Sequence, residues 1–509
     1  MQDATQTLKD LLAGLQGCQV TGNDCIPVTA VAYHSQDVVQ GSVFVALKGL
    51  RTDGHCFLNA ALERGARVIV SEQELAPPPG VTVVRVPDAR LAMAHLSAAF
   101  YRHPSREMKL VGITGTNGKT TTTYLLEAII GTAGHLAGVV GTVNYRVGPR
   151  HWPAAVTTPE SLDLQKLLRE MRRHGANHVF LEVSSHALDL KRVDCTTFAA
   201  AVFTNLSQDH LDYHREMESY FAAKSRLFLE LLANGSASAG TAVLNLDDPR
   251  GEELHRRVSV PTLTYGSHPR SQVRPLIKRF RRRGVEARLS TPAGEIDIKS
   301  SLVGPFNLYN ILAATATALA LGLTLEEIAR GIDALEGAPG RLERFGPPEG
   351  PAVFVDYAHT PAALASVLKA LSALDFSRLI TVFGCGGDRD RSKRPLMGQA
   401  AAAASHLAIV TSDNPRSEDP LSIIQEIEAG LKAKNVPRVT IAEAKRGQTG
   451  YLVEPDRREA IRLAVKLAWP GDAILVAGKG HENYQIRGQE RLHFDDREEV
   501  QEALKENYG

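Results

Sequence analysis

A glycine-rich loop near residue 115 has the residue types of a phosphate-binding loop. It lies between a run that predicts a buried strand, KLVGITG, and a run that predicts a helix, TTTYLLEAII. Glycines let backbone N–H groups curl around phosphate oxygens, and the helix amino terminus adds positive potential. Lys119 would reach the β and γ phosphates, and Thr120 would bind Mg²⁺. Position 113 is isoleucine where the strict pattern has glycine, so the match is to the shorter GxxGK[ST] form, made by Gly115, Thr116, Asn117, Gly118, Lys119, Thr120 and Thr121.

Two polar motifs follow later strand-like runs of the same region. Glu182 ends HVFLEV, and His210 follows AAAVFTN. Both motifs therefore emerge at strand ends on the phosphate-loop side of the predicted sheet. Oxygen-rich ligands suit Mg²⁺, and a second Mg²⁺ beside the γ-phosphate would neutralise charge. Zinc and a purely structural role stay open for the histidines, because Glu182 and His186 are spaced i, i+4, as are His210 and His214, although HExxH is absent.

Composition narrows the class of protein. The chain has 509 residues and a net charge of +1, which argues against general affinity for nucleic acid or a membrane surface. A signal peptide and a run of about 20 apolar residues are both missing, so we expect no membrane insertion. Five widely spaced cysteines without a CxxC pair fit reduced thiols in the cytoplasm. The basic run 278–283 could be an RNA or phosphate patch, but a solvated strand edge is favoured.

Alternating strand and helix patterns predict an α/β fold of three domains, at 1–104, 105–337 and 338–509. These are a small N-terminal α/β domain, a central P-loop-type domain with a mostly parallel sheet, and a C-terminal Rossmann-like domain. Helices are expected at 1–17 and 89–103, an antiparallel hairpin within 272–300, and a Pro/Gly-rich linker at 337–351. The predicted strands are 28–35, 41–49, 66–72, 81–86, 178–183, 199–205, 241–246, 352–357, 379–384, 406–412, 439–444 and 473–478.

Eleven motifs give the chain a resemblance to the Mur ligase family from about residue 28 to the end. In order they are GTNGKTT, TTP, EVSSHAL, FTNLSQDHLDYH, YFAAK, GPFN, PGRLERF, VDYAHTP, GCGGDRDRSKRP, SDNPRSEDP and GKGHENYQ. The chain most resembles the members that add 2,6-diaminopimelate to a UDP-linked muramoyl dipeptide. The resemblance implies a first domain that holds the uridine nucleotide, a central one that holds ATP, and a third that brings the amino acid.

The resemblance also implies acyl-phosphate chemistry in peptidoglycan synthesis. The D-glutamate γ-carboxylate attacks the ATP γ-phosphate, and the amine of meso-diaminopimelate then displaces phosphate through a tetrahedral intermediate. A free carboxylate is a poor acceptor because its leaving group would be oxide, so phosphorylation supplies a better one. The protein then mainly aligns groups and stabilises charge. These small molecules are the expected partners, with two Mg²⁺ ions, and we expect a cytoplasmic monomer.

Residue roles carry over from the family motif by motif. Lys119, Glu182, His210 and Lys224 would form the catalytic set, with Thr120, Glu182, His210 and Lys224 around Mg²⁺. Lys224, which by its surroundings alone reads as a surface lysine, matches the family lysine that CO₂ carbamylates into a carboxylate-like group. The further ATP-facing positions would be Asn307, Arg341 and Asp356. The UDP-substrate positions would be Ser35, Thr157, Thr158, Ser184 and Arg192. The first domain departs from the family, which often has Asp-Ser-Arg where this chain has His34-Ser35-Gln36.

The motif Asp413-Asn414-Pro415-Arg416 bears on which amino acid is added. Diaminopimelate is lysine with an extra carboxylate at its far end, and a planar guanidinium suits a bidentate carboxylate contact. Arg416 is therefore the expected selector, and the plainer alternative is a loop ion pair with Glu418 or Asp419. The full set expected around diaminopimelate is Arg389, Asp413, Asn414, Pro415, Arg416, Gly478 and Glu482.

Three other functions remain open from the sequence. A sister ligase that adds L-lysine would share all but the selecting arginine. A folylpolyglutamate synthase-like ligase would share the phosphate loop and carboxylate activation, but the long first domain and the DNPR motif argue against it. A non-catalytic nucleotide-binding regulator would bind nucleotide without amino-acid-dependent release of ADP.

Overall fold

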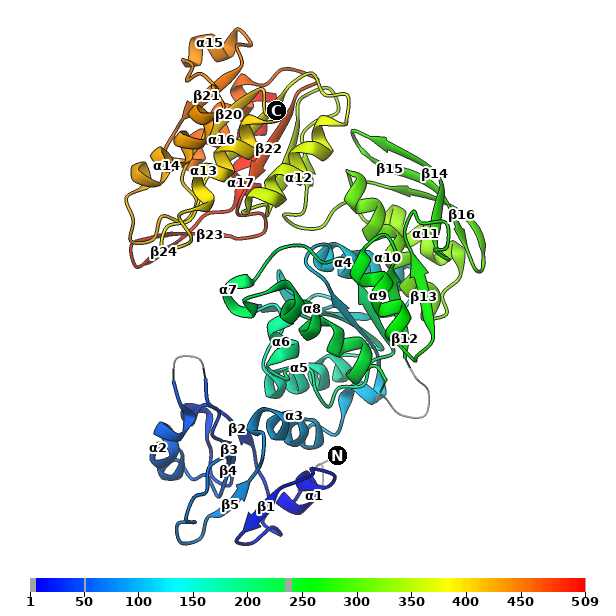
Figure 1. Ribbon diagram of the computed structural model, residues 1–509, viewed down its shortest axis with the longest axis vertical. Helices are drawn as coiled ribbons and strands as arrows, with labels where there is room; N and C mark the ends of the chain where they lie inside the picture. Colours follow the sequence, from blue (N-terminus) through cyan, green and yellow to red (C-terminus); the bar gives the residue numbers. More distant parts are fainter. Residues whose placement is uncertain (1–5, 50–51, 234–239, 509) are drawn as a thin grey trace. The chain divides into compact units, whose positions relative to one another are not determined.

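The computed structural model describes residues 6–49, 52–233 and 240–508. It is an α/β structure in which helices cover mostly parallel sheets (Figure 1). The chain divides into two compact units. The first comprises Met1–Arg274, Thr291–Ala293 and Asn310–Gly331, and the second comprises Pro275–Ser290, Gly294–Tyr309 and Ile332–Gly509. The predicted fold class is confirmed.

The first unit begins with a five-stranded sheet of order β1-β5-β4-β3-β2. Its apolar core includes Leu162 from the neighbouring α5, which ties it to the next sheet. The helix at the start of the chain is shorter than predicted: it begins after the capping residue Thr7 and ends before Gly14, and residues 1–5 lie outside the described part. The elements are α1 (Leu8–Leu12), β1 (Gln19–Thr21), β2 (Val31–Ala32), β3 (Val43–Val45), α2 (Leu58–Glu63), β4 (Val68–Ser71), β5 (Thr82–Arg85) and α3 (Ala89–Phe100).

The second sheet of this unit has eight strands in the order β13-β12-β11-β6-β10-β7-β8-β9. The strands from β13 to β7 are parallel, and β8 and β9 extend the edge antiparallel. The parallel strands are buried almost throughout, as expected of a sheet covered on both faces. The eight strands of the sheet are β6 (Lys109–Thr114), β7 (Ala137–Val140), β8 (Asn144–Val147), β9 (Arg150–Pro153), β10 (His178–Glu182), β11 (Ala200–Phe203), β12 (Thr241–Asn245) and β13 (Thr262–Tyr265).

Helices connect these strands and continue beyond them. Helix α8 runs directly into a π-helical turn at Leu227–Leu231. Among the described residues, no helix is both long and apolar enough to span a membrane, and the apolar helix α10 is largely buried. The helices are α4 (Lys119–Thr132), α5 (Ser161–Arg173), α6 (Ser185–Asp189), α7 (Leu211–His214), α8 (Met217–Arg226), α9 (Pro249–Arg257), α10 (Pro305–Ala320) and α11 (Leu325–Ala334).

A three-stranded sheet occupies the segment predicted as a hairpin. Its strands are β14 (Arg274–Arg281), β15 (Gly284–Thr291) and β16 (Gly294–Ser300), in that order. The expected turn at 291–294 separates β15 from β16. The basic run 278–283 lies on and just after β14, an edge strand, and its basic side chains are exposed. That placement is the solvated strand edge that the sequence favoured.

The second unit is built on a six-stranded sheet of order β17-β18-β22-β19-β20-β21, parallel except for β17. Apolar clusters cover both of its faces. The elements are β17 (Glu343–Phe345), β18 (Ala352–Asp356), α12 (Pro361–Ser372), β19 (Leu379–Phe383), α13 (Lys393–Ala402), β20 (Leu407–Val410), α14 (Pro420–Ala433), α15 (Ile441–Lys445), β21 (Gly450–Val453), α16 (Arg457–Leu467), β22 (Ala473–Ala477), β23 (Tyr484–Arg487), β24 (Glu490–His493) and α17 (Asp496–Tyr508).

Two sequence predictions are wrong in this unit. The stretch 337–351 is not only a linker, because Glu343–Phe345 pair with β18 as the antiparallel edge strand β17. The predicted strand at 439–444 is helix α15, and the fifth parallel strand is β21. Thr440 and Glu443 explain the helix: each side chain accepts a hydrogen bond from the other residue's backbone N–H, at 3.2 and 2.7 Å. This capping box supplies acceptors for two backbone N–H groups at the start of the helix. In a strand, the same N–H groups would need acceptors on a neighbouring strand.

Thr440→Ala should loosen helix α15, because it removes the hydroxyl that accepts the Glu443 N–H. We expect backbone amides of this helix to exchange roughly fivefold faster in hydrogen-exchange mass spectrometry. Glu443→Gln is the matched control, since glutamine also completes a capping box. Unchanged exchange in the alanine variant would show that tertiary packing, rather than the cap, specifies the helix.

Candidate active site

The phosphate loop joins β6 to α4 with a backbone that requires glycine. Gly115 and Gly118 have φ values of 140° and 88°, and a Cβ atom on either would clash with Thr204 or Asn310, respectively. The segment that follows the neighbouring strand β11 holds the loop in place, since the Thr116 N–H donates to the carbonyl of Asn205 at 2.9 Å. The predicted phosphate-binding residues are therefore brought together in a curled loop at a helix amino terminus.

Lys119 and Lys224 converge on one carbonyl of this loop. Their Nζ atoms donate to the carbonyl oxygen of Gly115 at 2.8 and 3.0 Å. Lys224 is 1 % exposed, and the ring of Tyr220 lies 4.6 Å from its Nζ. Burial, with the nearby charge of Lys119, holds the pKa of Lys224 well below its usual range. Lys224 is thus not the surface lysine that its local sequence suggested.

Glu182 ends β10 as a buried carboxylate, 1 % exposed. It accepts hydrogen bonds from the Thr120 hydroxyl at 3.0 Å, the Thr142 N–H at 3.0 Å and the Thr142 hydroxyl at 2.9 Å. Gly141 leaves room for it, because a Cβ there would clash with the carboxylate. The carboxylate therefore lies directly against the first turn of the phosphate-loop helix.

The oxygen donors at this point fit Mg²⁺. Thr120 Oγ1 and Glu182 Oε2 lie 3.0 Å apart, and both are small, hard oxygen ligands. Within the described ranges there is no group of three or more His, Cys, Asp or Glu side chains that could hold a metal ion. Mg²⁺ is commonly bound by one or two carboxylates together with water and phosphate oxygens. The donor set thus suits a nucleotide-bound Mg²⁺ and does not suit a zinc site of three or four protein ligands.

His210 belongs to an aromatic cluster beside Lys224. Its ring is 5.0 Å from that of His186 and 6.1 Å from that of Tyr220, between ring centroids. The Tyr220 hydroxyl lies 3.2 Å from Thr116 Oγ1, so this ring links the cluster to the phosphate loop. The His210 side chain is 45 % exposed, so it borders solvent, whereas the neighbouring His214 is buried and lies 2.9 Å from the Ser185 hydroxyl.

Four of the five predicted UDP-substrate residues are connected to Glu182 directly or through one neighbour. The Thr158 hydroxyl donates to the Glu182 carbonyl at 2.8 Å and lies 3.4 Å from the Ser184 hydroxyl. The Arg192 guanidinium donates to the Thr158 carbonyl at 3.1 Å. Thr157 is connected through Thr142, with 3.1 Å between the two hydroxyl oxygens.

Ser35 lies elsewhere in the unit, on a cavity of about 440 Å³ in the first sheet region. Arg90 and Glu160 also line it, and Glu160 forms an ion pair with Arg192 at 2.8 Å. Polar contacts thus lead from the cavity, through Glu160 and Arg192, to Thr158 and the end of β10. A ligand with a polar body longer than one sugar could follow this track.

The remaining ATP candidates, Asn307, Arg341 and Asp356, all belong to the second unit. Asp356, at the end of β18, accepts the N–H groups of Leu342 and Ala358 at 2.7 and 2.8 Å. Burial raises its pKa, although the charge of Arg341 opposes that effect. Asn307, near the start of α10, is buried and donates to the carbonyl of Val303 at 2.8 Å.

The DNPR and GKGHE motifs meet at the carboxyl ends of β20 and β22. Lys479, fully buried, donates to Asn414 Oδ1 at 3.0 Å and lies 3.5 Å from Asp413 Oδ1 and 3.8 Å from Glu482 Oε2. Gly478 permits the approach, since a Cβ there would lie 2.9 Å from Asp413 Oδ2. Burial would raise the pKa of Asp413, but Lys479 and Arg457 hold it below the usual value. Burial and the charge of Asp413 raise the pKa of Glu482.

Arg416 has an unusual backbone and an available guanidinium. Its φ is 54°, and its N–H and carbonyl bond to Ile486 and Gly488 of the β23–β24 hairpin at 3.1 and 2.7 Å. Its Nη1 donates to the carbonyl of Gly387 at 2.7 Å. Among the described residues, no carboxylate pairs with Arg416 or with Arg389, which both flank Gly386. The alternative of an ion pair with Glu418 or Asp419 is therefore wrong here.

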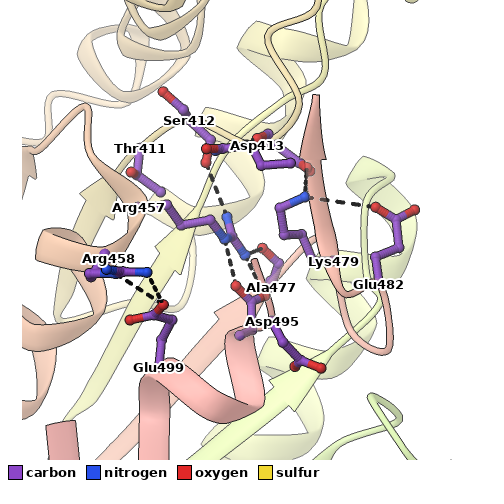
Figure 2. A network of polar contacts seen from close by, with 12 residues as sticks. Thr411, Ser412, Asp413, Arg457, Arg458, Ala477, Lys479, Glu482, Asp495 and Glu499 are labelled. Atoms are coloured by element: carbon purple, nitrogen blue, oxygen red, sulfur yellow. Dashed lines mark hydrogen bonds and ion pairs between the residues drawn. The ribbon is translucent and has the colours of Figure 1, made fainter. Parts of the chain in front are cut away.

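The buried Arg457 links the strand ends that precede the DNPR and GKGHE motifs, as Figure 2 shows. Arg457, fully buried, donates to the carbonyls of Ala477 and Ser412 at 3.0 and 3.4 Å, at the ends from which the two motifs emerge. It also makes a two-pronged ion pair with the fully buried Asp496, with both contacts at 2.7 Å. Arg457 thus fixes two strand ends and the start of α17 together.

Sequence reasoning missed several residues that hold the predicted ones. These residues are Thr142 and Tyr220 in the first unit and Lys479 and Arg457 in the second, and none was singled out. Thr142 and Arg457 carried no local signal, because a threonine in a turn and an arginine at a helix start are common on surfaces. Lys479 lies within GKGHE and Tyr220 within YFAAK, so a search of each motif for buried neighbours could have found both.

Together the curled phosphate loop, the buried carboxylate and the buried lysine define a nucleotide-dependent α/β enzyme of the P-loop type. Three family models match the chain: the Mur ligase family, catalytic domain, at residues 27–101; the Mur ligase middle domain, at 113–318; and the Mur ligase, glutamate ligase domain, at 340–480. The chain belongs to the Mur ligase family, whose members are ATP-dependent amide ligases.

Individual relatives agree over nearly the whole length. The chain is 48% identical to UDP-N-acetylmuramoyl-L-alanyl-D-glutamate–2,6-diaminopimelate ligase of Geobacter metallireducens, over 98% of each chain. It is 45% identical to the protein of the same name from Geobacillus kaustophilus, over 98% of this chain and 99% of that one. A solved structure with that name superposes with a TM-score of 0.73 at 33% identity, covering 99% of this chain and 100% of the other.

Arg457→Met should destabilise the second unit strongly, because Asp496 would be left buried without its counter-charge. We expect a loss of about 3–5 kcal/mol in the free energy of unfolding, measured by urea denaturation. Arg462→Met is the matched control: Arg462 lies on the same helix and pairs with Glu459, Glu502 and Glu506, whose side chains are all more than half exposed, so its loss should cost at most about 1 kcal/mol. Similar losses for the two variants would show that the buried pair contributes no more than a surface one.

Proposed function

We propose that this protein uses ATP to join meso-2,6-diaminopimelate to UDP-N-acetylmuramoyl-L-alanyl-D-glutamate in peptidoglycan synthesis. The observation that carries the choice of amino acid is Arg416, a guanidinium without a carboxylate partner among the described residues, next to the buried polar groups of Asp413, Asn414 and Glu482. The relatives named for this reaction, 41–48% identical over nearly full length, support it. The reaction proceeds through an acyl phosphate of the D-glutamate side chain.

The phosphate-loop site of the first unit acts on the nucleotide and the acid. Lys119 and the N–H groups of the curled loop bind the β and γ phosphates. Thr120 and Glu182 hold Mg²⁺, which neutralises phosphate charge when it is bound. Thr158, Ser184 and Arg192 orient the muramoyl dipeptide, and the track through Glu160 to the Ser35 cavity suits its uridine end. Alignment of this kind removes much of the entropy cost of bringing acid and phosphate together.

Lys224 is the proposed site of carbamylation. Only an uncharged amine attacks CO₂, and burial, which holds the pKa of this amine well below its usual range, favours that form. Attack on CO₂ releases a proton and leaves a carbamate anion next to Lys119, because the two lysine side chains meet at the Gly115 carbonyl. An amine held beside the charge of Lys119 would thus be replaced by an anion that Lys119 attracts. His210 and the carbamate would complete the second Mg²⁺ site.

The third-domain site binds the amino acid. Arg416, with Arg389 beside it, pairs with the distal carboxylate of diaminopimelate, a group that lysine lacks. Asp413 and Glu482 face the ammonium and Asn414 the neighbouring polar groups, with Gly478 leaving space for close approach. Asn307, Arg341 and Asp356 are assigned to ATP.

The setting follows from these substrates. ATP and UDP-linked precursors are cytoplasmic metabolites, so we place the protein in the cytoplasm. One chain carries residues for all three substrates, which favours a monomer that size-exclusion chromatography with light scattering would verify.

Arg416→Ala should raise the KM for diaminopimelate by roughly 10–100-fold, because a charge-assisted two-pronged contact is lost. The KM values for ATP and the UDP-substrate should stay within about twofold in an ADP-release assay. Arg438→Ala is the control, because this arginine is exposed and is not among the residues proposed to bind a substrate. Equal weakening of all three substrates, or efficient use of lysine by the unchanged protein, would argue against the assigned amino acid.

Lys224→Ala should abolish most of the activity, and short carboxylic acids such as formate or acetate should partly restore it by supplying the missing carboxylate. Lys119→Ala is the matched control, because an added anion cannot replace a phosphate-binding cation. Circular dichroism verifies that both variants fold. A folded Lys224→Ala protein that no acid rescues would contradict carbamylation.

A further inference from the structure

Arg416 and Glu418 bind opposite ends of a single peptide unit. The guanidinium of Arg416 donates to the carbonyl oxygen of Gly387 at 2.7 Å, and Glu418 Oε1 accepts the N–H of Asp388 at 2.6 Å. This carbonyl and this N–H belong to the same Gly387–Asp388 peptide. A carboxylate is therefore located one peptide width from the guanidinium, with which it does not pair.

Arg394 forms an ion pair with this carboxylate of Glu418. Its side chain is fully buried, and its guanidinium donates to Glu418 Oε2 at 2.9 Å and Oε1 at 2.7 Å. The contact holds the pKa of Glu418 at about 2, so Glu418 is charged under all physiological conditions. Arg394 also donates to Glu426 at 3.0 Å, but Glu426 has a second partner in Arg391. Among the described residues, Arg394 is the only cation that pairs with Glu418.

The geometry points to Arg394 as a positioning residue for amino-acid selection: it sequesters Glu418 so that the guanidinium of Arg416 stays available to the distal carboxylate of the incoming diamino acid. The inference rests on the proposed function of Arg416. Arg394 itself does not contact the substrate, since its side chain is fully buried.

Competition between carboxylates is the physical basis. An arginine close to an internal carboxylate binds an external one more weakly, because the external group must first displace the internal partner. The backbone of Arg416 is fixed in a left-handed conformation by two hydrogen bonds to the β23–β24 hairpin, so Arg416 cannot move far from Glu418. A rotation of the freed Glu418 side chain is then a route to a new ion pair with Arg416.

The test compares Arg394→Met, Glu418→Gln and the double variant of the full-length protein in steady-state ligation. Arg394→Met should raise the KM for diaminopimelate roughly tenfold while kcat and the KM for ATP stay within about twofold. Glu418→Gln alone should not raise the KM, and the double variant should return to within about threefold of the unchanged protein. Arg391→Met, which leaves the Arg394–Glu418 contact in place, is the matched control.

Each result decides for or against the inference. A double variant no better than Arg394→Met would overturn it, because a purely structural role of Arg394 is not relieved by removing Glu418. An unchanged KM in folded Arg394→Met would overturn it as well. If Arg394→Met does not fold, Arg394→Lys keeps the cation but not the two-pronged contact, and should show a rise of roughly threefold that Glu418→Gln again removes.

Failure of the proposed function itself would look different. In that case the unchanged protein would ligate no amino acid, or would use lysine and diaminopimelate equally well. When selectivity is present, lysine serves as an internal probe: it has no distal carboxylate, so Arg394→Met should leave the KM for lysine unchanged. Equal weakening of both amino acids would count against a role in selection.

Discussion

The first unit depends on one buried anion, the carboxylate of Glu182. Removing a carboxylate from water is costly unless hydrogen bonds replace its hydration. Three such bonds come from two segments far apart in sequence, the phosphate-loop helix through Thr120 and the turn after β7 through Thr142. Satisfying this one group therefore fixes where the helix amino terminus lies relative to the end of β10. The proposed phosphate and acid sites would acquire their spacing from this same constraint.

In the second unit the principal buried charged groups are cations, whereas Glu182 in the first unit is a carboxylate. Arg394, Arg457 and Lys479 are cations without exposed surface, and each is surrounded by carboxylates and carbonyls at the carboxyl edge of the sheet. Buried pairs of this kind add little stability compared with apolar packing, but breaking one is expensive. Their hydrogen bonds connect strand ends and loops that are far apart in sequence, as Arg457 does for Ser412, Ala477 and Asp496. A rigid set of loops suits discrimination between substrates that differ by a single carboxylate.

The sequence allowed the strand-end chemistry to be predicted, because loop composition and apolar runs are local. The phosphate loop, Glu182 and the DNPR motif all lie at the ends of parallel strands, as expected. Partners that come from distant segments could not be read in this way: nothing near Thr142 indicates that it binds Glu182. Helix α15 was missed although its Thr440–Glu443 spacing is a local signal, since the β-branched run 439–441 outweighed it. The burial of Lys224 could not be predicted from its own segment, whose residues are typical of a surface helix. It became evident only from the fold.

Arg416 shows most clearly why residue type alone does not settle function. The segment 378–416 contains Arg378, Arg389, Arg391, Arg394 and Arg416, all equally charged. In the structure Arg378, Arg391 and Arg394 are paired with Asp472, Glu426 and Glu418. Pairing removes these three as receptors for an external anion and leaves Arg389 and Arg416, which flank the same glycine. Under the proposed assignment, selectivity would therefore depend on the distribution of the internal carboxylates, because they determine which guanidinium makes no ion pair with another described residue.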